Sequence, residues 1–178
     1  MLKDFSLKFV DIMIGVVLGL GFQWVPSLTY PWQYIAFAVA YLEIIDYWIE
    51  YSPSLKKWPP KKEIDLILDV SIVFSLFLYI YSTQLTIYHF LGAGILIRLL
   101  DYFWIFSSKI EFNPTGLDKT YMNTWLKLNL ILASGSAIAL GLGYYLNIAP
   151  LNILFIYIGI KLFIRILASL HYKKIHYT

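Results

Sequence analysis

Ionisable side chains recur inside stretches of the chain that are otherwise apolar. A carboxylate or a base in such surroundings can bind a cation, relay a proton or neutralise a partner, and an opposite charge nearby sets the pKa of an acid. At the centre of a lone membrane helix each would cost roughly 2.5–3.5 kcal/mol. We therefore expect them to face one another or water. The residues of this set are Asp11, Glu43, Asp46, Asp69, Arg98, Asp101, Lys161 and Arg165.

Their spacing places several of them on common helix faces. Glu43, Asp46 and Glu50 follow each other at intervals of three and four residues, and so do two other pairs, Arg98 with Asp101 and Lys161 with Arg165. The pattern predicts either a polar vestibule open to the cytoplasm or a buried network of acids and bases. Two interpretations stay open: an ion or proton pathway, with Glu43, Asp46, Asp101 and Lys161 as its determinants, or structural ion pairs that hold the helices in register.

Composition identifies the elements that must carry these residues. Of the 178 residues, 60% are hydrophobic, 19% are aromatic and only 14% are charged, which is too apolar for an ordinary soluble domain. We expect an all-α, single membrane domain over residues 1–178. A helix needs about 20 apolar residues to cross the bilayer core. Six stretches meet this length: about 7–26, 32–51, 64–83, 86–107, 124–146 and 150–171.

Lysines distinguish the two ends of these stretches. The segments near 27–31, 83–85 and 147–149 have no Lys or Arg, whereas the N-terminal segment, the second and fourth connections and the tail all carry lysines. The positive-inside rule then places both termini in the cytoplasm of a multi-pass cell-membrane protein. The net charge of +3 fits this bias and attraction to membrane lipid, and does not indicate nucleic-acid binding.

The six stretches resemble three copies of one helical hairpin, with repeat units at about 7–51, 62–107 and 124–171. Lys8-Phe9-Val10-Asp11 in the first copy corresponds to Lys62-Glu63-Ile64-Asp65 in the second and to Lys127-Leu128-Asn129 in the third. The second helices share Glu43-Ile44-Ile45-Asp46, Arg98-Leu99-Leu100-Asp101 and Arg165-Ile166-Leu167-Ala168. Shared order and spacing predict an internal triplication about a pseudo-threefold axis.

Small residues predict where helices approach closely. Gly15 and Gly19 in the first stretch, and Gly135 and Gly141 in the fifth, belong to small-residue patterns of the kind that let membrane helices touch. We expect the first and fifth helices to be central, packing within the bundle or against a second subunit. Irregular segments are expected only at 52–63, where Pro53 should end a helix, and at 108–123, with a turn at Asn113-Pro114-Thr115-Gly116.

Catalytic and cofactor chemistry is not expected. Asp65 and Asp69 are spaced like the metal-binding pair of six-span CDP-alcohol phosphotransferases, but the upstream Asp-Gly-x-x-Ala-Arg element is missing and Lys61 stands at the position of a motif glycine. There is no cysteine, and His89, His171 and His176 lie at helix ends or in the tail. We therefore predict no enzyme activity, no metal and no cofactor.

Two short motifs resemble the six-span Phe-Ser-Asp-motif potassium channels of bacteria, archaea and lysosomes. Phe9-Val10-Asp11 lies early in the first helix, with Val10 in place of the motif serine, and Tyr47-Trp48 precedes a basic loop. The resemblance implies a pore lined by the first helix and constricted by hydrophobic side chains.

The leading hypothesis is an ion channel or small transporter with a cation or proton pathway through the inner charge network. The alternative is a non-catalytic structural subunit or scaffold of a larger membrane complex, in which the charges specify packing only. Membrane lipid is expected as a partner in both cases, and a homo-oligomer or partner membrane subunits are possible in either.

Overall fold

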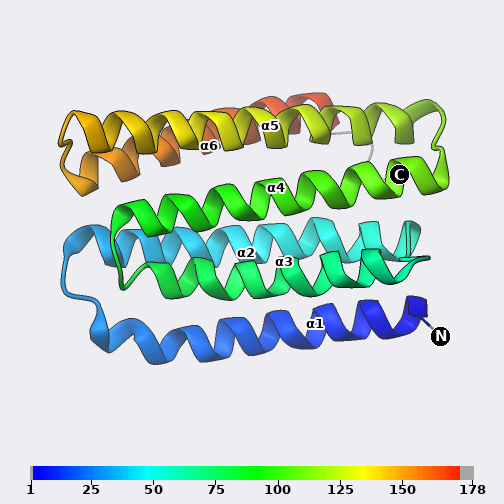
Figure 1. Cartoon of the computed structure of the whole chain (residues 1–178), viewed down its shortest axis with the longest axis horizontal. Helices are drawn as coiled ribbons and strands as arrows, with labels where there is room; N and C mark the ends of the chain where they lie inside the picture. The colour runs from blue at the N-terminus through cyan, green and yellow to red at the C-terminus, as the bar shows by residue number, and fades with distance from the viewer. Residues whose placement is uncertain (1, 173–178) are drawn as a thin grey trace.

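The chain folds as a bundle of long helices (Figure 1). The computed structural model describes residues 2–172, with the side chains of 2–6, 169, 171 and 172 left out, so that Lys173, Lys174 and His176 of the predicted basic tail lie outside the described residues. Over the described range the structure is all-α, as predicted. Its elements are α1 (Leu2–Gly21), a 3-10 helix η1 (Phe22–Ser27), α2 (Pro31–Lys57), α3 (Glu63–Ser82), α4 (Ile87–Phe112), α5 (Gly116–Tyr145) and α6 (Pro150–Tyr172).

Successive helices run in opposite directions along the bundle. The first described turn of α1 and the last of α6 lie at the same end of the bundle (Figure 1). Helix α1 packs on α2 and α3, α4 packs on α3 and α5, and α6 packs on α5 and α2. The expectation that the first and fifth helices are central is wrong, because α1 and α5 lie at opposite edges and α3 and α4 join the two halves. The internal triplication stays a prediction.

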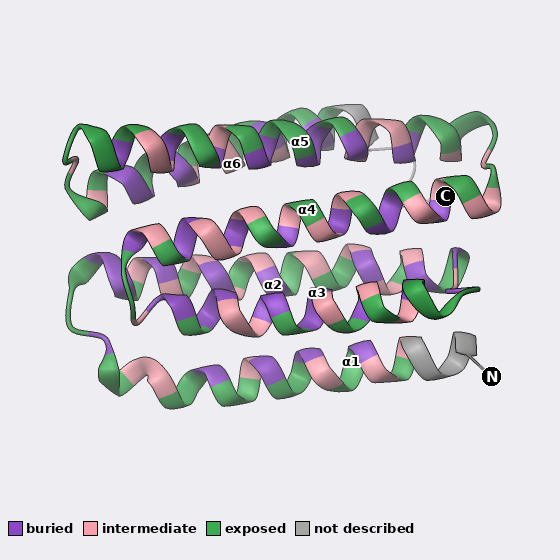
Figure 2. Ribbon diagram, viewed as in Figure 1, coloured by how far each residue is buried: buried purple, intermediate pink, exposed green. Residues whose placement is uncertain are grey.

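Five of the helices are long and apolar enough to cross a membrane: Leu7–Ser27, Glu63–Ser82, Ile87–Phe112, Gly116–Tyr145 and Pro150–Ala168. Their outer faces carry large apolar side chains, among them Phe74, 61% exposed, and Phe163, 63% exposed (Figure 2). Apolar side chains on a lipid-facing surface cost nothing, so this distribution is that of a membrane-embedded bundle. Helix α2 is not among the five, and it is the helix that carries Glu43, Asp46 and Glu50.

The connections at the lysine-rich end are shorter than the sequence indicated. Pro53 lies inside α2, which continues to Lys57, and α4 continues to Phe112. The predicted break at Pro53 is wrong: the proline removes only the backbone bond to the carbonyl of Ile49, and α2 continues past it to Lys57, with an added bond from Ser54 Oγ to the carbonyl of Glu50 at 2.9 Å. The predicted turn at 113–116 is confirmed: Asn113 has φ 42° and Gly116 has φ 56°.

The four glycines named above as packing positions have more space than Gly94 and than Gly143, which belongs to the same small-residue pattern in the fifth stretch. A Cβ added to Gly15, Gly19 or Gly141 would meet nothing within 4 Å, and one at Gly135 would lie 3.4 Å from Ile160. By contrast a Cβ at Gly143 would lie 2.5 Å from Ile153, and one at Gly94 would lie 2.8 Å from the hydroxyl of Tyr157. The first and fifth helices therefore present most of the predicted glycines away from their neighbours in this chain.

Candidate functional site

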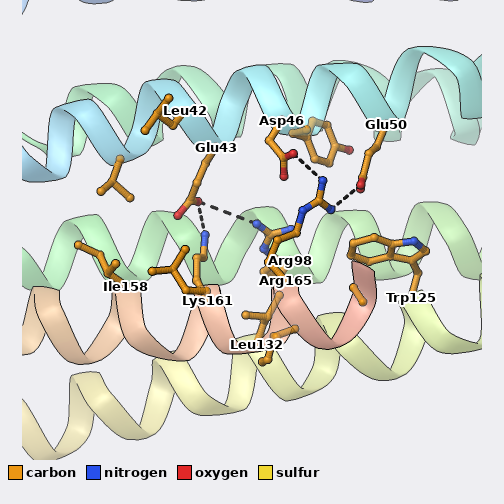
Figure 3. A pocket seen from close by; sticks show the side chains of 15 residues that line it. Leu42, Glu43, Asp46, Glu50, Arg98, Trp125, Leu132, Ile158, Lys161 and Arg165 are labelled. Carbon is orange, nitrogen blue, oxygen red and sulfur yellow. Dashed lines mark hydrogen bonds and ion pairs between the residues drawn. The ribbon is translucent and has the colours of Figure 1, made fainter. Parts of the chain in front are cut away.

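A cavity of about 330 Å³ opens between α2, α4, α5 and α6, and most of the ionisable residues singled out by the sequence line it. Helix α2 forms one wall, α6 the facing wall, and α4 and α5 the floor (Figure 3). Apolar side chains make up the rest of the surface, including Leu42, Leu132 and Ile158. The charged members are Glu43, Asp46, Glu50, Arg98, Lys161 and Arg165.

Glu43 is the centre of the first group of contacts. Its carboxylate forms an ion pair with Lys161 on the facing helix, accepts a hydrogen bond from Tyr79 at 3.0 Å, and lies 3.9 Å from the guanidinium of Arg98. The side chains of Glu43 and Lys161 are only 19% and 13% exposed. Two cations from different helices thus neutralise one carboxylate in a nearly dry part of the cavity.

Arg165 is the centre of the second group, whose acids lie one to two turns of α2 nearer the lysine-rich end than Glu43. One guanidinium nitrogen pairs with Asp46 at 2.6 Å, and another pairs with Glu50. These side chains are better exposed, at 41% for Arg165 and 50% for Asp46. Arginine suits this place because its planar guanidinium offers several donors in fixed directions and can hold two carboxylates at once. Ion pairs between α2 and α6 therefore cross the cavity at two levels (Figure 3).

Arg98 reaches the cavity floor from α4 with few partners. Its Nε atom is buried and has no hydrogen-bond partner within the part of the chain that the structure describes. Its guanidinium lies 3.9 Å from the carboxylate of Glu43, which is too long for a hydrogen bond. A buried guanidinium that is not fully bonded is costly, because the donors have lost their water.

A cluster of buried aromatic side chains is joined to the cavity through Glu43 but does not line it. Tyr79, Phe90 and Tyr157 are at most 1% exposed. The Tyr79 and Phe90 rings stack with centroids 4.6 Å apart, and the hydroxyls of Tyr79 and Tyr157 lie 2.8 Å apart. Together with the Glu43 contacts, these bonds form an unbroken polar chain from Lys161 through Glu43 and Tyr79 to Tyr157.

Asp101 and Asp69 lie close to the cavity but form a separate set of bonds. Asp101 accepts hydrogen bonds from Tyr47 at 3.1 Å and from Asn129 at 2.5 Å, and Asp69 accepts one from Tyr51 at 2.6 Å. The rings of Tyr47 and Tyr51 stack between them, with centroids 5.0 Å apart. These hydrogen bonds to the two carboxylates come from hydroxyl and amide donors on α2 and α5.

Asp11 and Asp65 are distant from this network. Asp11 accepts a hydrogen bond from the indole of Trp48 at 2.8 Å on an exposed face between α1 and α2. Asp65 accepts bonds from the backbone of Lys61 and Lys62 and from Ser107, so it caps the start of α3. Asp65 and Asp69 thus serve different neighbours, and no group of three possible metal ligands occurs over the residues that were described.

Salt bridges close the lysine-rich end of the bundle. Lys62 pairs with Glu111 at 2.9 Å, and Lys57 pairs with Asp118 at 2.6 Å. The hydrogen bond with Glu111 raises the pKa of Lys62 above its ordinary value. The Lys57–Asp118 pair is exposed and contributes little to stability, whereas the Glu111 side chain of the other pair is only 5% exposed. The two pairs join the end of α2 to α5 and the residue before α3 to α4.

The residues that sequence reasoning missed are the neutral members of the network. Tyr47, Tyr51, Tyr79, Tyr157 and Asn129 are uncharged and, in a chain rich in aromatic residues, look like lipid-facing or interfacial side chains. One signal was present: all but Tyr51, the last residue of the predicted span 32–51, stand within a span and not at its end, where interfacial tyrosines gather.

Comparison of the chain with protein-family models, with curated proteins and with solved structures finds no match.

Proposed function

We propose that this protein is a small membrane transporter or ion channel whose cation or proton pathway begins in the cavity between α2 and α6. The observation that supports this most is the convergence of three acids and three bases from three helices on one cavity at membrane depth. Ion pairs that only hold helices together need no cavity beside them. Well-packed apolar side chains in their place would give a bundle that is at least as stable.

The polar chain from Lys161 to Tyr157 supports a proton as one transported species. Lys161, Glu43, Tyr79 and Tyr157 are joined by consecutive hydrogen bonds or ion pairs. Each of these groups can accept and release a proton or reorient a hydroxyl, which a fixed apolar contact cannot do. The packed rings of Tyr79, Phe90 and Tyr157 would be the barrier that must rearrange before ions pass to the other side.

The topology belongs to the same proposal. Helix α2 runs beside α3 through the bundle (Figure 1), so we infer that it is the sixth span, with its acids turned toward the cavity. Both termini would then be cytoplasmic in the cell membrane, as the lysines indicate. Because the chain has no cysteine, the single variants Thr29→Cys and Thr115→Cys can be treated with a thiol reagent that does not cross the membrane. We expect Thr29→Cys to react only from the outside and Thr115→Cys only from the cytoplasmic side. Labelling of both from one side would contradict this topology.

Flux through liposomes tests the transport proposal. Purified protein should pass H⁺, K⁺ or Na⁺ down an imposed gradient, and Glu43→Gln, Asp46→Asn and Asp101→Asn should each slow the flux about tenfold or more, which corresponds to about 1.4 kcal/mol in the barrier. Asp118→Asn is the matched control, since its exposed carboxylate pairs with Lys57 outside the cavity. Wild-type liposomes that pass none of these ions would contradict the proposal.

A scaffold role is the second candidate, and the exposed glycines of α1 favour it. Gly15 and Gly19 lie on one face with open space around them, and small residues on such a face allow another membrane helix to approach. Absence of flux together with stable co-purification of other membrane subunits would support this alternative.

A further inference from the structure

We propose that the cavity binds the headgroup of a phospholipid that carries both a phosphate and a primary ammonium group, and that this lipid enters sideways between α2 and α6. This inference goes beyond the transport proposal, because it concerns binding and holds whether or not ions cross the membrane. It combines three features of the cavity: its side opening, the order of polar and apolar residues along it, and the separation of charge between its walls.

The cavity opens toward the lipid, not only toward one end of the bundle. Leu42 on α2 and Leu162 on α6 both line it, yet they are 68% and 58% exposed. Asp46, also a lining residue, has half of its side chain exposed at the same opening. Arg165 pairs with Asp46 at one carboxylate oxygen, and the exposed remainder of this carboxylate still needs a polar neighbour at membrane depth, which an acyl chain is not.

Polarity along the cavity follows that of a lipid in the leaflet at the lysine-rich end. Arg165 lies fifteen residues from the start of α6, which is about 22 Å of a hydrocarbon core that is about 30 Å thick. The charged residues are therefore nearer the lysine-rich surface, and Val39, Leu42 and Ile158 lie toward the middle of the membrane. A headgroup beside Arg165 would place its acyl chains along these apolar side chains.

The two walls carry opposite charge. Helix α2 contributes Glu43, Asp46 and Glu50, whereas α4 and α6 contribute Arg98, Lys161 and Arg165 (Figure 3). A phosphate would bond the basic wall, where the buried Nε of Arg98 has no partner among the described residues, and arginine is well suited to phosphate oxygens. A primary ammonium would donate hydrogen bonds to Asp46 and Glu50. Basic pockets between membrane helices are known binding sites for lipid phosphates; the acids here add a requirement for a cation.

Lipid retention by the purified full-length protein tests this inference. Native mass spectrometry would compare phosphatidylethanolamine, phosphatidylcholine and phosphatidylglycerol, each added at the same ratio. We expect phosphatidylethanolamine to be retained roughly tenfold better than the other two, because the choline headgroup has no N–H donor and the glycerol headgroup has no cation. Equal retention of all three, or preference for phosphatidylglycerol, would overturn the proposal.

Two variants separate the site from lipid around the protein. Arg98→Gln removes the phosphate contact, and Leu162→Trp narrows the opening while leaving every charge in place. Both should lower phosphatidylethanolamine retention roughly tenfold. Ile156→Trp, on an exposed part of α6 that does not line the cavity, is the control and should retain the lipid. Size-exclusion chromatography shows whether Leu162→Trp folds as well as Ile156→Trp. If it does, and if both variants retain the lipid equally, the proposed site is wrong. This conclusion does not depend on whether Arg98→Gln folds.

The same preparations distinguish the two proposals. Wild-type protein that retains phosphatidylethanolamine but passes no ion would support the lipid site and contradict ion transport. Protein that passes ions but retains the three lipids equally would support ion transport and contradict the lipid site.

Discussion

Gly94 on α4 faces the hydroxyl of Tyr157 on α6, and a Cβ at this glycine would lie 2.8 Å from that oxygen. The missing side chain is what lets Tyr157 reach Tyr79, and through it Glu43. A backbone position of α4 thus determines the geometry of the polar chain without contributing a polar atom.

Gly94→Ala should therefore displace Tyr157 and lengthen its bond with Tyr79. We expect a loss of about 1–3 kcal/mol of stability, as for other overpacked sites, measured by thermal unfolding in detergent. Gly92→Ala is the matched control, because a Cβ there meets nothing within 4 Å. Equal stability of the two variants would mean that Tyr157 moves aside at no cost.

Breaking the Glu43–Lys161 pair should be more costly than replacing it. Lys161→Met leaves the half-buried Glu43 carboxylate facing only Arg98 and Tyr79, and loss of one partner of a buried pair costs about 3–5 kcal/mol. The double variant Glu43→Leu with Lys161→Met should recover much of this loss. A double-mutant cycle, measured by denaturant unfolding, gives the coupling; additive losses would contradict direct pairing.

Replacement of Asp65 by alanine should destabilise the protein more than replacement of Asp118. Asp65→Ala removes the cap of α3 and the bond to Ser107, and loss of such a cap costs about 0.5–2 kcal/mol. Asp118→Ala removes only the exposed pair with Lys57, whose expected contribution is about 0–1 kcal/mol. Thermal unfolding of both variants compares them directly, and a larger loss for Asp118→Ala would reverse the assignment.

Substitutions on the open face of α1 separate packing inside the chain from packing between chains. Gly15→Leu and Gly19→Leu should leave the unfolding temperature of the isolated chain unchanged, since the space around both glycines is open. Their effect should appear only in the size of the detergent-solubilised complex, measured by light scattering. Unfolding at lower temperature without a change in size would show that these glycines contact their own bundle.

The sequence predicted the helices and the convergence of charge well, for one physical reason. Hydrocarbon penalises an ionisable group in any position that lacks a partner, so the stripes on the second, fourth and sixth helices had to meet, and Glu43, Asp46, Lys161 and Arg165 do meet. The particular pairs were not predictable, because they depend on the rotation and tilt of each helix.

The contacts made by glycine and tyrosine could not be read from the sequence. Gly15 and Gly94 cannot be distinguished from the sequence, because each is a glycine within an apolar helix. Only the structure shows that Gly94 packs against Tyr157 of another helix, whereas the space around Gly15 is open. Pro53 was misread for a related reason: a proline that removes one backbone bond does not by itself end a helix, and α2 keeps its later bonds, down to that from the N–H of Trp58 to the carbonyl of Ser54.

That proline gives α2 a built-in place to bend. Pro53 has no N–H to offer the carbonyl of Ile49, so the last turn of α2 is attached to the rest of the helix by one backbone bond fewer. The missing bond lies about one turn beyond Glu50, which forms an ion pair with Arg165 of α6. Bending at Pro53 would therefore move Lys56 and Lys57 without breaking the ion pairs of Arg165 with Asp46 and Glu50. The part of α2 before Pro53 would stay in place for as long as these ion pairs persist.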